Sequence, residues 1–155
     1  MGSLPLVVGW REWIHLPELG IRMIKAKVDT GARTSSLHAE NIAIIHRGQE
    51  RRVAFTVFPM QRNREKGMAV ELPLIDERWV RSSNGIRELR PVIRTEVDIG
   101  GRVWPIELTL TRRDLMGFRM LLGRQALRGH AAIDPARSFI NRKAKKKRRP
   151  SLRPS

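Results

Sequence analysis

The sequence contains no cysteine and no tyrosine, and its aromatic residues are four tryptophans and four phenylalanines. Without cysteine there is neither a disulfide framework nor a thiolate zinc site, which suits a reducing cytosol. No apolar run approaches the roughly 20 residues of a membrane-spanning helix. The short run from Leu4 to Val8 lacks the preceding basic segment of a secretory signal. We therefore expect a soluble, cytoplasmic protein that is not attached to a membrane.

Acidic residues are also scarce. The chain has 15 Asp and Glu against 31 Lys and Arg, a formal net charge of +16. Eight of the basic residues lie in Arg142–Ser155, which has no acid, so residues 1–141 keep 23 − 15 = +8. A body that is basic without its tail predicts a polyanionic partner, such as nucleic acid, an acidic peptide or the ribosome surface.

The length of 155 residues and the hydrophobic content of 41% predict one domain with its own core. We place this domain at residues 1–141. The segment Arg142–Ser155 has a Lys, Arg, Pro and Ser composition that cannot bury enough apolar surface to fold, so we predict a disordered basic tail. Arg62–Gly67 is predicted to be a polar loop.

Helical periodicity is scarce, and the best candidate is a short helix over Arg124–Gly129. Gly100-Gly101 and Asn84-Gly85 are both typical of two-residue hairpin turns. The sequence therefore predicts an all-β domain with one short helix. The expected strands are Leu6–Trp13, Met23–Val28, Ile42–Ile45, Val53–Phe58, Met68–Leu74, Arg90–Ile99, Val103–Thr111 and Met120–Leu122.

One segment carries the residues of a possible catalytic site. Asp29 follows an apolar strand and precedes Thr30 and Gly31, so a carboxyl group is exposed where the backbone turns. Aspartic peptidases need two such carboxyl groups, which share one proton across a bound water. An Asp-Thr-Gly triplet can equally be an ordinary Asx turn. A second feature, the apolar run Met120–Leu122 ending at Gly123 before a short helix, favours the catalytic interpretation.

With an Asn-Gly hairpin between these two segments, the chain resembles the retropepsin family over residues 20–130. That family has Asp-Thr-Gly-Ala, a flap hairpin and a hydrophobic segment ending in Gly-Arg, in this order. Residues Lys25–Ala39 more narrowly resemble the bacterial, RimB-like members, labelled "ATP-dependent zinc protease" and associated with RimK-type glutamate ligases. The resemblance implies a single-lobe acid-protease barrel with a dimeric active site.

By the same resemblance, Asp29 is the catalytic acid, Thr30 braces the active-site loops across the dimer, and Gly31 and Ala32 line the substrate channel. The chain has one Asp-Thr-Gly, so two protomers must supply the pair of carboxyl groups, and a homodimer is expected. The zinc and ATP of the family label find no motif here. The histidines, which we expect to be ordinary core or surface residues, are scattered at His15, His38, His46 and His130, so we predict no metal and no cofactor.

Basic residues near this site predict the substrate. Arg33 stands where the viral members carry an acid, and the expected flap, Trp79–Val92, adds Arg81, Arg87 and Arg90. Guanidinium groups suit carboxylates, so an acidic peptide is expected. The RimB-like resemblance implies the same class, namely poly-α-glutamate tails such as those on ribosomal protein S6.

Two departures from the viral pattern are visible in the sequence. Asp29 and Gly123 lie farther apart than in the viral proteins, which predicts an insertion within residues 40–75. Because Arg33 replaces the acid that pairs with the viral Gly-Arg arginine, Arg124 needs another partner. Glu88, Asp114 and Asp134 are the candidates.

The competing hypothesis is a basic β-barrel without enzymatic activity that binds RNA or the ribosome, with the tail as its electrostatic contact. It explains the tail better, but it leaves the Asp-Thr-Gly-Ala and Leu-Leu-Gly-Arg segments as coincidences. Trp10, Trp13, Trp79 and Trp104 could stack on bases, although in strands such residues are more often part of the core or its rim. The two roles can also combine, because a tail that binds ribosomes raises the local concentration of a ribosomal substrate.

Overall fold

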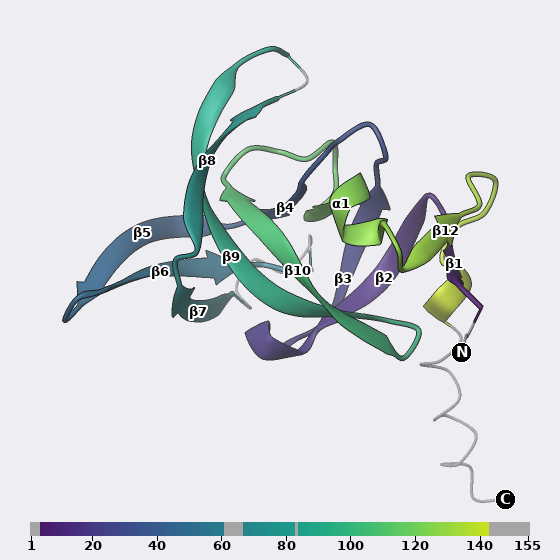
Figure 1. The fold of residues 1–155 in the computed structure, drawn as a ribbon, viewed down its shortest axis with the longest axis horizontal. Helices are drawn as coiled ribbons and strands as arrows, with labels where there is room; N and C mark the ends of the chain where they lie inside the picture. The colour runs from purple at the N-terminus through teal and green to yellow at the C-terminus, as the bar shows by residue number, and fades with distance from the viewer. Residues whose placement is uncertain (1–3, 61–66, 83, 143–155) are drawn as a thin grey trace, which may run out of the picture.

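The computed structural model describes residues 4–60, 67–82 and 84–142. Their largest sheet closes into a six-stranded β-barrel (Figure 1). The strands follow the order β10-β4-β11-β3-β2-β9, and β9 pairs back with β10 to close the ring. This confirms the predicted all-β, retropepsin-like barrel with one short helix. The barrel strands are β2 (Arg11–Leu16), β3 (Ile21–Val28), β4 (Ser35–His38), β9 (Arg87–Ile99), β10 (Arg102–Thr111) and β11 (Met120–Leu122).

The barrel core comes from residues that alternate along each strand, because successive side chains of a strand point to opposite faces. In β2, Ile14 and Leu16 are buried while Trp13 and His15 stay partly exposed. In β10 the same alternation buries Ile106, Leu108 and Leu110. The alternation of apolar residues along each strand therefore determines which side chains form the core.

Both predicted hairpins form, but only one has the predicted turn. Gly100 and Gly101 have φ of 62° and 95°, so they make the two-residue turn between β9 and β10, where Ile99 pairs with Arg102. At the second hairpin, β8 (Asp76–Arg81) pairs with β9, and the Ser82 N–H donates to the Ile86 carbonyl. The turn is thus longer than the two residues predicted from Asn84-Gly85.

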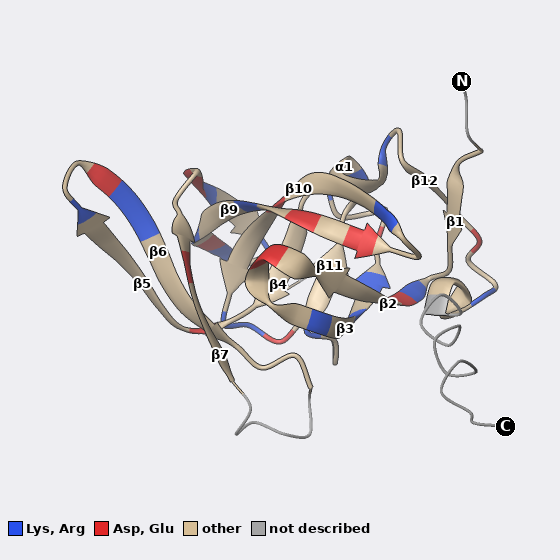
Figure 2. Ribbon diagram, turned by 90° about the horizontal axis from the view of Figure 1, so that it is seen from below, with Lys and Arg blue, Asp and Glu red and all other residues tan. Residues whose placement is uncertain are grey.

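The strands β5, β6 and β7 build a separate three-stranded antiparallel sheet beside the barrel (Figure 1). It lies within the segment where the sequence predicted an insertion. Val53, Phe55 and Val57 are buried and join the core of the barrel, while charged residues lie toward the far end of β6 (Figure 2). The strands are β5 (Glu40–Arg47), β6 (Glu50–Val57) and β7 (Met68–Pro73).

The remaining elements correct or complete the predictions. The expected strand Leu6–Trp13 is interrupted at Gly9, where a Cβ atom would lie 2.3 Å from the Arg137 carbonyl oxygen. The strands β4 and β12 were not predicted. The elements outside the two sheets are β1 (Leu6–Val8), which pairs with β12 (Ala131–Ile133), the 3-10 helices η1 (Pro17–Leu19) and η3 (Ile140–Arg142), and α1 (Arg124–Leu127).

The ends of the domain are held by Glu12, whose side chain is fully buried. Its carboxylate accepts hydrogen bonds from the Gly9 N–H at 2.7 Å, from the Ile140 and Asn141 N–H groups at 3.1 Å, and from the Asn141 side chain at 3.2 Å. A buried charge is tolerated only when it is satisfied in this way. Glu12 therefore joins β2 to both terminal segments.

None of the helices in the described ranges is long and apolar enough to cross a membrane. The predicted loop Arg62–Gly67 lies outside the described residues except for Gly67, and the predicted tail lies outside them after Arg142.

Candidate active site

Asp29 lies directly after β3, in the connection from β3 to β4. Its backbone N–H donates to the Leu122 carbonyl of β11 at 2.9 Å, and its own carbonyl accepts the Ala32 N–H at 3.1 Å. Its carboxylate oxygen Oδ1 accepts the Gly31 N–H at 3.0 Å. The side chain is partly exposed, and Thr30 and Gly31 are exposed. The loop therefore presents a fixed carboxyl group at the surface.

The segment from β11 to α1 packs against this loop at Gly123. A Cβ atom on Gly123 would lie 2.5 Å from the Thr34 carbonyl oxygen and 2.9 Å from that of Ala32, so only glycine fits there. The Gly123 N–H donates to the buried Ser35 hydroxyl at 2.9 Å. Ser35 was missed from the sequence, and the only signal was a hydroxyl residue shortly after the Asp-Thr-Gly segment.

Arg124 finds its partners in the Asp29 loop itself. Its guanidinium Nη1 donates to the Thr30 carbonyl at 3.1 Å and to the Gly31 carbonyl at 3.4 Å, and its backbone N–H donates to the Ala32 carbonyl at 2.9 Å. None of the acids considered from the sequence, Glu88, Asp114 or Asp134, takes this place. A guanidinium with two carbonyl acceptors replaces the expected ion pair.

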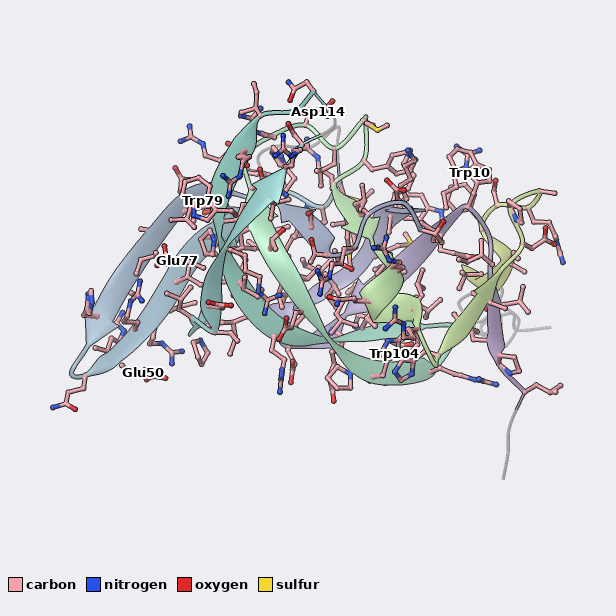
Figure 3. The ribbon with its side chains drawn as sticks, turned by 45° about the horizontal axis from the view of Figure 1, so that its top comes forward. Trp10, Glu50, Glu77, Trp79, Trp104 and Asp114 are labelled. Atoms are coloured by element: carbon pink, nitrogen blue, oxygen red, sulfur yellow. The ribbon has the colours of Figure 1, made fainter. Side chains whose placement is uncertain are left out.

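The β8–β9 hairpin rises at the same end of the barrel as the β3–β4 connection (Figure 1). Arg81 and Arg87 are exposed there, as expected for residues that contact a substrate. The guanidinium of Arg87 lies 5.0 Å from the centre of the Trp79 ring, which is 60% exposed (Figure 3). Arg33 is exposed in the connection from β3 to β4, next to the partly buried Ala32.

Arg90 does not occupy the position expected of a substrate-binding residue, because only 4% of its side chain is exposed. Its Nε donates to the Glu88 carboxylate at 2.8 Å, and its Nη1 donates to the Ser36 hydroxyl at 3.0 Å and to the Thr109 hydroxyl at 3.4 Å. The alternation of β9 turns Arg90 inward, so it ties the hairpin to β4 and β10 instead of facing a substrate.

The residues do not fit the zinc of the family label. Among the described residues, no three His, Cys, Asp or Glu side chains come together as a metal site would require. The histidines lie apart: His15 contacts Asp98 at 3.4 Å, His38 contacts Glu40 at 3.4 Å, and His130 stacks on Trp104. The described residues therefore offer no cluster that would hold the zinc of the family label.

Comparison with known proteins adds the family. A probable alpha-L-glutamate ligase of Parasynechococcus marenigrum is 50% identical over 130 residues, covering 84% of this chain and 28% of that protein. A protein of the same name from Shewanella pealeana is 45% identical over 139 residues, covering 90% and 30%. This chain thus spans less than a third of the length of these relatives.

A solved structure and a family model match most of the chain. The crystal structure of a Legionella pneumophila protein of unknown function, assigned to DUF785, has a TM-score of 0.71 and 30% identity, covering 88% of this chain and 98% of that one. Residues 7–144 match the family model described as retropepsin-like aspartic endopeptidase RimB. The chain therefore belongs to the RimB-like family of retropepsin-like aspartic endopeptidases.

Proposed function

We propose that this protein is a cytoplasmic aspartic peptidase that hydrolyses acidic peptides, in particular poly-α-glutamate tails such as those on ribosomal protein S6. The observation that carries this proposal is the braced Asp29 loop, tied to β11 through the Leu122 carbonyl and to α1 through Arg124. Because each chain has one Asp-Thr-Gly segment, the active form is a homodimer with its substrate on the twofold axis.

The reaction uses the two Asp29 carboxyl groups of the dimer as a pair with a single shared proton. The ionised group takes a proton from the water between them, and the water oxygen attacks the peptide carbonyl carbon. The protonated group gives its proton to the carbonyl oxygen. When the tetrahedral intermediate collapses, the C–N bond breaks and the leaving nitrogen receives the proton taken from the water. One hydroxyl of the intermediate returns its proton to the other carboxylate, which leaves a carboxylic acid and restores the shared proton of the pair.

Two observations support an acidic substrate. Arg33, Arg81 and Arg87 are exposed on the catalytic loop and on the hairpin at the same end of the barrel, and guanidinium groups bind carboxylates in pairs of hydrogen bonds. In addition, the longer relatives carry the name of a glutamate ligase. A peptidase domain within such proteins would act on chains of glutamate.

The test is to incubate the purified protein with a poly-α-L-glutamate peptide and a neutral control peptide, and to follow the products by mass spectrometry. We expect cleavage of the glutamate chain only. The Asp29→Asn variant keeps an oxygen for the Gly31 N–H but cannot take or give the proton, so its kcat/KM should fall by about a thousandfold. Cleavage by this variant at the wild-type rate would show that Asp29 is a turn residue.

For the basic tail we propose a separate role in contacting RNA or the ribosome, supported by the eight Lys and Arg without an acid in Arg142–Ser155. Such binding should weaken steeply with salt and disappear on truncation after Asn141. Peptide cleavage should survive the same truncation. If a folded dimer cleaves neither peptide while RNA binding persists, the non-enzymatic β-barrel becomes the better account.

A further inference from the structure

A pocket of about 340 Å³ lies between strands β8, β9 and β10 on one side and helix α1 on the other. Figure 3 shows Trp104 of its lining beside α1, and the Trp104 indole N–H donates to the Ala126 carbonyl at 2.8 Å. This volume is at the lower end of ligand pockets, so it suits one side chain better than a large cofactor. The polar side chains in its lining come from Thr34, Ser35, Arg78, Arg94, Glu107, Thr109, Gln125 and His130.

The pocket and the catalytic loop share a wall. Gln125 lines the pocket, and its backbone N–H donates to the Arg33 carbonyl at 3.2 Å. The preceding residue, Arg124, holds the Thr30 carbonyl. A peptide in a strand conformation advances about 3.3 Å per residue. The pocket thus adjoins the Asp29 loop through Arg33, and an extended substrate would reach it with a residue away from its scissile bond.

The polar groups of the pocket call for a ligand that accepts hydrogen bonds. The acid of the lining, Glu107, is already engaged by Arg78 at 2.8 Å, and Arg78 is itself fixed by Asp76 at 3.0 Å. Arg94 is 63% exposed, and its ion pair with Glu107 is long, at 3.7 Å. Within the described ranges, the Thr34 hydroxyl and the Gln125 amide donate no side-chain hydrogen bond. The pocket lining therefore has more hydrogen-bond donors without a partner than acceptors without a partner.

We propose that this pocket is an outer specificity subsite that receives a side-chain carboxylate of the peptide substrate, with Arg94 as the residue that binds it. The inference rests on the proposed function and extends it beyond the scissile bond. Arg94 gives up only its long contact when it turns toward the ligand, because Glu107 keeps its shorter ion pair with Arg78. Gln125 and Thr34 lie in the same lining and supply further donors.

Binding can be measured without cleavage in the full-length Asp29→Asn protein labelled with ¹⁵N. The indole N–H of Trp104 is a reporter inside the pocket lining. We expect its resonance to shift when hexaglutamate is added. Arg94→Gln should weaken this binding by about three- to tenfold, as for a partly exposed charge pair. Arg102→Gln, on an exposed arginine at the β9–β10 turn outside the pocket lining, is the matched control and should change nothing.

A kinetic experiment locates the subsite along the substrate. In hexaglutamates with a single Gln at each position in turn, the wild type should lose kcat/KM by about three- to tenfold at one position away from the cleaved bond. Arg94→Gln should cleave that peptide and hexaglutamate equally well. If the Trp104 resonance does not shift, or if the Arg94 and Arg102 variants bind hexaglutamate equally well, the proposed subsite is wrong even when hexaglutamate is cleaved. Shifts without any cleavage would instead refute the peptidase function and leave the carboxylate pocket standing.

Discussion

The Asp29 loop and the β8–β9 hairpin lie at the same end of the barrel, but they are held in different ways. The loop is fixed by backbone hydrogen bonds to Leu122 and Ala32, by Arg124, and by a contact at Gly123 that leaves no room for one methyl group. The hairpin ends the sheet on the side of β8, and it exposes Trp79, Ile86 and Leu89. The Asp29 loop is thus held by many contacts, whereas the outer part of the hairpin is exposed.

This difference fits the function that we propose. A catalytic carboxyl group must be placed within a fraction of an ångström before the substrate arrives, which requires rigid support. A hairpin that covers an extended substrate must adapt to it, and segments with few buried contacts open at low free-energy cost. Arg90 marks the boundary, because it anchors the base of the hairpin in the barrel while the outer part stays exposed.

The largest effect is expected from filling the space at Gly123. Its φ of −88° is open to any residue, so only crowding opposes Gly123→Ala. We expect a loss of about 3 kcal/mol in the free energy of unfolding, at the upper end of overpacking costs, together with loss of cleavage. Urea denaturation measures it. The control is Gly48→Ala, where φ is 65° and the surroundings are open, so only about 1 kcal/mol of backbone strain is expected. Equal costs at both positions would contradict the crowding argument.

A smaller loss is expected at the hairpin base from Arg90→Met. The change removes the charged hydrogen bonds to the Glu88 carboxylate and to the buried Ser36 hydroxyl. We expect the free energy of unfolding to fall by about 2 kcal/mol. Arg87→Met, on the exposed face of the same strand, should change it by less than about 0.5 kcal/mol. If the two variants unfold alike, Arg90 does not anchor the hairpin.

The outer part of the hairpin should respond in binding and not in stability. Trp79→Thr keeps a good strand former, so unfolding should change by less than about 0.5 kcal/mol. Because an exposed aromatic ring is removed from the face that would meet the substrate, KM should rise about threefold with kcat nearly unchanged. Ile75→Thr, at a similarly exposed apolar residue just before β8, should leave KM unchanged. An effect of Trp79→Thr on kcat alone would argue against substrate contact.

The smallest effect concerns the separate sheet. Hydrogen bonds from Arg47 and Arg52 lower the pKa of Glu71 to about 2, from 4.5 in a free side chain. A lowered acid pKa stabilises the fold above the unfolded value and loses that contribution as pH falls from 4.5 toward 2. The small Tm difference between wild type and Glu71→Gln should therefore be present at neutral pH and close across this range. A Tm difference independent of pH would exclude this linkage.

The barrel strands were predictable because their side chains alternate, and the Asp29 segment was predictable because it combines a strand end, an acid and a glycine. The strand β4 was not, because Ser35–His38 has only one aliphatic residue. Its two serines are buried because their hydroxyls bind Gly123 N–H, Thr109 and Arg90, partners that lie far away in the sequence. Local pattern alone does not reveal such pairings.

The same limit explains the error at Arg90. Arg81, Arg87 and Arg90 of the expected flap were all predicted to meet a substrate, although a charged residue can be buried when it is paired. The partner Glu88 stands two residues away and so on the same face of the strand, but hydroxyls of β4 and β10 complete the set. The pocket around Arg94 was missed for a similar reason, because its walls come from five separate parts of the chain.

Glu12 holds the two terminal segments of the described chain at one place. The Asn141 side chain reaches the Val7 carbonyl at 2.9 Å, so β1 and η3 lie together, far from the β8–β9 hairpin in Figure 1. The same buried carboxylate accepts hydrogen bonds from the Gly9, Ile140 and Asn141 N–H groups, so loosening either segment leaves part of a buried charge unsatisfied. The two segments are therefore expected to detach from the barrel together, as one cooperative unit.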